Sequence, residues 1–149
     1  MSANHVKRTL YWITFFAIAM AFLESSVVVY LREILYPEGF KFPLNPIEPD
    51  LAVTEILREA ATLVMLLAVG IIAGKTPTRR FAWFIYSFGI WDIFYYIFLK
   101  LLLGWPESLL TWDILFLIPT TWTGPVIAPV ILSAVMIFLA LGIIGYSQY

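Results

Sequence analysis

Four long apolar segments, separated by more polar connections, dominate the 149-residue chain. They cover about residues 9–33, 51–74, 80–103 and 125–146. Each meets the requirement of roughly 20 apolar residues for a helix that crosses a bilayer. The pattern therefore predicts an all-α fold, an integral membrane four-helix bundle that forms a single membrane domain over residues 1–149.

The composition supports the same class of protein. Hydrophobic residues make up 62% of the chain and charged residues 13%, and the mean hydropathy is +0.90. A soluble domain has about 45–50% apolar and about 25% charged residues. The lipid bilayer is therefore the first expected partner. The sequence has no basic patch suited to nucleic acid, so no nucleic-acid partner is expected.

The chain has no cysteine and a single histidine, His5, which lies in the N-terminal tail. The lack of cysteine excludes disulfides and thiol nucleophiles. One imidazole in a tail cannot assemble a zinc or haem site. We therefore expect no metal site, and the sequence identifies no cofactor.

The connection between the third and fourth segments contains an apolar stretch of its own. Pro106 near its start and Pro119 at its end predict a short helix over about residues 106–118. Such a helix is too short to span, so we expect it to lie in the membrane interface or to re-enter from the outer side. Asp113 is expected to be a loop or cap residue there.

The distribution of basic residues predicts the orientation of the chain. Lys7 and Arg8 precede the first segment, and the short connection at 75–80 carries three basic residues and no acid. The connection at 36–50 carries three acids and one lysine. By the positive-inside rule both termini are cytoplasmic (N-in, C-in). We expect a bacterial-type inner (plasma) membrane.

Three acids lie inside the apolar segments: Glu24, Glu59 and Asp92. The uncharged runs beside the first two, residues 9–23 and 60–74, are too short to span a bilayer without them. A carboxylate in hydrocarbon is costly and is a functional-site hypothesis by default. Distances along each helix from the inner basic residues, at about 1.5 Å per residue, place all three acids in the outer half of the membrane.

Four further residues are predicted to lie beside these acids. Arg58 precedes the second acid in sequence and Trp91 precedes the third, and Tyr95 and Tyr96 lie one helical turn after it. Carboxylates among aromatic side chains suit a hydrophobic cation or a proton. No catalytic residue can be assigned. The residues predicted to bind a ligand or to carry protons are Glu24, Glu59, Asp92, Arg58, Trp91, Tyr95 and Tyr96.

Three functions are compatible with this cluster. The first is binding, and as an extension transport, of a small hydrophobic or cationic ligand or of protons. In its architecture of four helices, with Glu24 in the first and aromatic residues nearby, the chain resembles the small multidrug transporters. The second is a membrane-embedded acid–base enzyme that acts on a lipid or isoprenoid. The third is a non-catalytic subunit of a larger membrane complex. A lipid or small-molecule ligand, a homodimer and a larger complex all stay open as partners.

A purely structural interpretation competes with all three. The acids could pair with basic side chains or tyrosine hydroxyls and so hold the helices together. The basic candidates are Arg58, Arg32 and Lys100. Apart from such pairing, we expect Arg32 and Lys100 to extend along the helix surface to the outer interface.

Overall fold

The computed structural model describes residues 3–146 and contains four long helices. They are α1 (Ala3–Leu35), α2 (Pro49–Ala73), α3 (Pro77–Leu103) and α4 (Ile127–Tyr146). All four are long and apolar enough to cross a membrane. The prediction of four spans is confirmed, and the fold is compatible with a multi-pass membrane protein.

Local sequence signals account for where α3 begins and ends. Pro77 occupies the first turn, where a missing N–H costs nothing. The hydroxyl of Thr76, at the N-cap, accepts a hydrogen bond from the backbone N–H of Arg79 at 3.3 Å. At the other end Gly104 adopts φ +67°, and its N–H donates to the carbonyl of Lys100. This left-handed residue ends the helix because it turns the backbone out of the helical path.

Helix α3 is the central element, and the other three helices pack against it. In the most apolar stretch of α3, 56% of the residues are buried, compared with 17% in α2 and in α4. Small residues allow this close packing. A Cβ added to Gly89 would lie 2.8 Å from the backbone carbonyl oxygen of Ser133 on α4. The sides of α2 and α4 that face away from α3 are exposed and carry apolar side chains.

A two-stranded antiparallel hairpin joins α3 to α4. Strand β1 (Trp112–Phe116) pairs with β2 (Trp122–Pro125), with an irregularity in register between Ile114 and Phe116. The predicted short helix over 106–118 is therefore wrong, and the fold is mostly helical, not all-α. A short helix is costly to nucleate. Aromatic and β-branched residues favour strands, and the hairpin lets the two segments satisfy each other's backbone groups.

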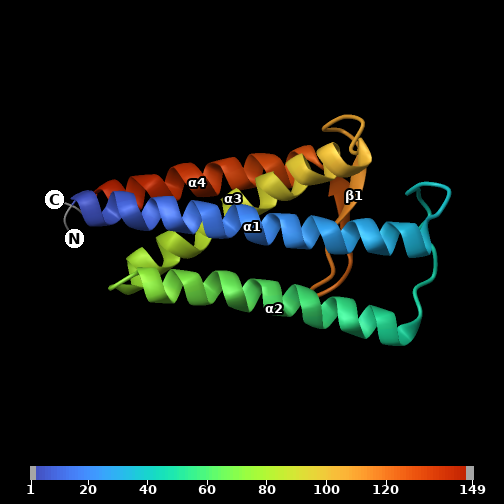
Figure 1. Ribbon diagram of the computed structural model, residues 1–149, viewed down its shortest axis with the longest axis horizontal. Helices are drawn as coiled ribbons and strands as arrows, with labels where there is room; N and C mark the ends of the chain where they lie inside the picture. The colour runs from blue at the N-terminus through green and yellow to red at the C-terminus, as the bar shows by residue number, and fades with distance from the viewer. Residues whose placement is uncertain (1–2, 147–149) are drawn as a thin grey trace.

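The molecule has two distinct ends (Figure 1). Both termini lie at one end, which we call the terminal end. The β-hairpin and the connection between α1 and α2 lie toward the other, which we call the hairpin end. An apolar core at the terminal end joins α1, α3 and α4; its buried residues include Ile13, Trp83, Tyr86, Ala140 and Ile144.

Candidate functional site

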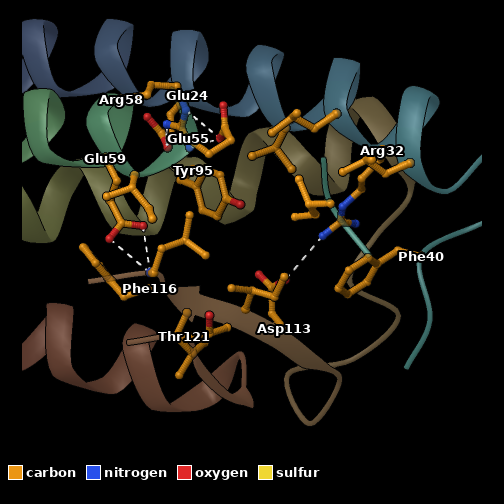
Figure 2. Close-up of a pocket in the computed structure, with 18 of the residues that line it drawn as sticks. Glu24, Arg32, Phe40, Glu55, Arg58, Glu59, Tyr95, Asp113, Phe116 and Thr121 are labelled. Carbon is orange, nitrogen blue, oxygen red and sulfur yellow. Dashed lines mark hydrogen bonds and ion pairs between the residues drawn. The ribbon is translucent and has the colours of Figure 1, made fainter. Parts of the chain in front are cut away.

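A cavity of about 270 Å³ opens between α1, α2, α3 and the hairpin (Figure 2). We call it the hairpin cavity. Its wall combines aliphatic side chains, aromatic rings and charged groups. All seven residues predicted from the sequence line it: Glu24, Glu59, Asp92, Arg58, Trp91, Tyr95 and Tyr96. The sequence thus identified residues that share one cavity, whereas their roles in it stay predictions.

In the wall of the cavity, Arg58 of α2 connects two acids. Its Nε and Nη2 atoms lie 2.9 and 2.8 Å from Oε2 of Glu55, one helical turn earlier. Its Nη1 donates to Oε1 of Glu24 on α1. The hydroxyl of Thr62 donates to the other oxygen of Glu24 at 3.3 Å. This group fastens α1 to α2 through charged side chains.

Glu59, on the next position of α2, holds the hairpin. Its carboxylate accepts hydrogen bonds from the backbone N–H of Leu117, at 3.0 and 3.1 Å, and from that of Ile118, at 3.0 Å. These two N–H groups follow β1 and find no partner in β2. An unpaired backbone donor away from water is costly. Glu59 therefore satisfies the end of the strand and fixes the hairpin against α2.

Asp92 connects α3 to α4. The hydroxyl of Ser133 donates to its Oδ2 at 2.8 Å, and both residues are buried. The neighbouring Trp91 stacks on Tyr95 and contacts Phe88 edge-on. Its indole Nε1 is buried and has no hydrogen-bond partner within the described residues. Asp92 and Trp91 thus belong to the part of the cavity wall that α3 contributes.

Two residues that were expected elsewhere also line the cavity: Arg32 and Asp113. The guanidinium of Arg32 lies 3.7 Å from the ring centroid of Trp105 and 4.4 Å from that of Phe40. Its Nη2 lies 3.5 Å from Oδ1 of Asp113, and Tyr96 donates its hydroxyl to Oδ2 at 3.2 Å. The expectation that Arg32 extends along the helix surface is wrong, because the aromatic rings and the carboxylate hold its side chain, which is only 11% exposed.

Asp113 is a buried residue of β1, not a loop or cap residue of a helix. Burial raises its pKa to about 6, and the nearby Arg32 guanidinium opposes this shift in pKa. The sequence did hold a signal for Arg32, which lies on the same helical face as Glu24. It held none for Asp113, because its place depends on the hairpin.

Lys100 donates to the carbonyls of Gly104 and Pro106 at the end of α3, away from the acids.

The arrangement has a chemical consequence. Each of the three predicted acids already accepts at least one hydrogen bond from the protein: Glu24, Glu59 and Asp92. Among residues 3–146, no group of three His, Cys, Asp or Glu side chains is placed to hold a metal ion. These hydrogen bonds support the structural interpretation of the acids. Groups that are free to bond a ligand are therefore expected among the other side chains of the cavity.

No protein-family model, no curated protein and no solved structure matches this chain. The fold by itself, four long apolar helices with a hairpin at one end, is compatible with a multi-pass membrane protein. Everything more specific follows from the residues of the cavity.

Proposed function

We propose that this chain is a membrane protein that binds a small, partly hydrophobic ligand in the hairpin cavity. One observation carries the proposal. A single space is bounded by aliphatic residues, aromatic rings and several charged side chains. Ligand sites typically combine a mostly apolar wall with a few placed polar groups.

The partners of the acids help to choose between ligand classes. A bare cation or a proton would have to compete with Arg58 for Glu24, and with backbone N–H groups for Glu59. A hydrophobic ligand needs no such exchange, because it would contact aliphatic residues such as Val28, Leu31 and Ile56. We therefore favour a hydrophobic or amphipathic ligand over a cation or proton, and binding over transport.

We further propose that both termini are cytoplasmic and that the hairpin cavity lies in the outer half of a plasma membrane. The basic connection at 75–80 supports this orientation. The chain has no cysteine, so maleimide can label only the cysteine that a substitution introduces. In right-side-out vesicles, a membrane-impermeant maleimide should label Lys41→Cys and spare Lys75→Cys. The reverse labelling would contradict the orientation.

The binding proposal is tested by filling the cavity. Ala52 lines it, whereas Ala61 lies on the same helix and is exposed. Native mass spectrometry of protein extracted in mild detergent should show a bound small molecule or lipid on the wild type. We expect Ala52→Trp to lower that bound fraction by weakening binding about tenfold, a loss of about 1.4 kcal/mol. Ala61→Trp, the matched control, should retain it. Equal retention by both variants would contradict the proposal.

A further inference from the structure

Arg32 has more hydrogen-bond donors than the protein uses. An arginine carries five N–H donors in a planar fork. Within the described chain, the one hydrogen bond of the Arg32 side chain runs from Nη2 to Oδ1 of Asp113, and its 3.5 Å length is at the limit for such a bond. By contrast, Arg58 engages three of its nitrogens with Glu24 and Glu55. Of the two arginines that line the cavity, Arg32 therefore keeps more unused N–H donors.

Aromatic contacts hold the guanidinium of Arg32. Its central carbon lies over the rings of Trp105 and Phe40, which stand nearly perpendicular to each other. Aromatic contact holds a guanidinium in place without consuming its N–H groups. A planar edge held in this way matches the two oxygens of a phosphate or carboxylate.

Tyr95 supplies a second, independent observation. Its hydroxyl makes no hydrogen bond within the described residues, and its ring lines the hairpin cavity. Figure 2 shows the ring between the Glu24–Arg58 pair and Arg32, with the hydroxyl oxygen directed toward the side where Arg32 lies. A phenol beside a cation is a suitable second donor to an anion.

The position of Arg32 along α1 indicates where the anion would come from. Arg32 lies in the last turn of α1, eight residues beyond Glu24, which is about 12 Å nearer the hairpin end. A basic side chain near the end of a spanning helix lies at the depth of lipid headgroups. Asp113 opposes an anion there, but the hydroxyl of Tyr96 already donates to its carboxylate.

We infer that the edge of Arg32 and the hydroxyl of Tyr95 form an oxyanion subsite that receives the phosphate of the ligand. The aliphatic wall of the cavity then holds hydrocarbon attached to that phosphate. This inference rests on the proposed function, since it names the polar part of the same ligand. A phospholipid headgroup and free inorganic phosphate share this chemistry.

The test is a binding titration of the full chain in a neutral detergent, followed by native mass spectrometry. The probes are dihexanoylphosphatidic acid, inorganic phosphate, and dihexanoylglycerol, which lacks the phosphate.

The main variant combines Arg32→Gln with Asp113→Asn, so that no buried charge is left unpaired. We expect it to weaken binding of dihexanoylphosphatidic acid by about tenfold or more. Tyr95→Phe should weaken binding by about threefold. Lys41→Gln, which removes an exposed cation from the same end, should leave binding unchanged.

The outcomes separate the alternatives. Weakened binding of the phospholipid alone supports a headgroup, and weakened binding of inorganic phosphate as well supports a general phosphate site. The inference is overturned if the folded double variant binds like wild type, or if dihexanoylglycerol binds as tightly as the phosphatidic acid. An equal loss in Lys41→Gln would also overturn it, since attraction would then be nonspecific. If Ala52→Trp abolishes binding while the Arg32 variant does not, only the oxyanion subsite fails. If Ala52→Trp leaves every probe bound, the proposed function fails.

Discussion

The two ends of the molecule solve the problem of packing helices in different ways. At the terminal end, α2 and α3 approach until their backbones touch. A Cβ added to Gly74 would lie 2.3 Å from the backbone nitrogen of Arg80, and one added to Gly70 would lie 2.7 Å from its carbonyl oxygen. At the hairpin end, β1 and the loop that follows it enter the space beside α2, and charged side chains replace direct backbone contact.

This difference explains why the polar residues gather where they do. Small residues and apolar side chains suffice to join helices that touch. Where the hairpin separates them, Arg58 reaches from α2 to α1 and Glu59 reaches from α2 to the backbone after β1. The cavity is the space that these side chains leave. The same acids can therefore be structural fasteners and parts of a binding site.

The largest effect is expected from removing the fastener at the hairpin end. Arg58→Met leaves Glu24 and Glu55 without their shared cation. Removal of one partner of a buried ion pair costs about 3–5 kcal/mol, and we expect about 3 kcal/mol because Arg58 is partly exposed. The free energy of unfolding in mixed micelles, titrated with dodecyl sulfate, measures the loss.

A matched variant distinguishes the cause of that loss. Combining Arg58→Met with Glu24→Gln and Glu55→Gln removes the acids that the single substitution leaves unpaired. We expect most of the lost stability to return. An unchanged stability of Arg58→Met would show that charged side chains do not join α1 and α2, and the contrast between the two ends would collapse.

The next effect is expected at the terminal end. Gly74→Ala forces a Cβ against the backbone of α3, and overpacking of this kind costs about 1–3 kcal/mol. Gly142→Ala is the control, because nothing lies within 4 Å of the added atom. The same dodecyl sulfate titration should show a loss for the first variant and little change for the second. If both lose stability equally, close backbone contact is not what holds this end together.

The sequence predicted the elements whose structure is set locally. The four spans followed from hydrophobic length, the three acids from their place inside those spans, and the four residues beside them from adjacency in sequence or helical spacing. The hairpin could not be predicted in this way, because its conformation depends on a remote partner. The N–H groups of Leu117 and Ile118 are satisfied by Glu59, about 58 residues earlier. No local pattern contains that information.

Arg32 illustrates the same limit inside the site. The sequence predicts that Arg32 lies on the same face of α1 as Glu24. Its enclosure in the cavity, however, depends on Phe40, Trp105 and Asp113, which belong to three separate connections or strands. A basic residue near a helix end ordinarily extends into the interface. Only the assembled hairpin end reveals that this arginine is enclosed.

The smallest effect is expected from pH, because the hairpin end holds a titratable residue, Asp113, outside the spanning helices. Burial raises the pKa of Asp113 from 3.8 to about 6, while Arg32 and the hydroxyl of Tyr96, which face it, favour its ionised form. The folded chain therefore takes up a proton between pH about 6 and about 4 that the unfolded chain does not. Lowering the pH from about 7 to about 5 should raise the free energy of unfolding by about 1 kcal/mol through this group. The contribution is lost again as the pH rises through about 6.

Comparison with Asp113→Asn measures this contribution together with the effect of the Asp113 charge on its neighbours, because all other titratable groups are common to both proteins. The wild type should gain stability relative to the variant as the pH falls over this range. Thermal unfolding followed by circular dichroism, at matched ionic strength, measures the difference. Parallel pH profiles would mean that Asp113 is already open to water and that the hairpin does not seal the cavity. A difference confined to this pH range would show that the stability of the hairpin end depends on pH through Asp113.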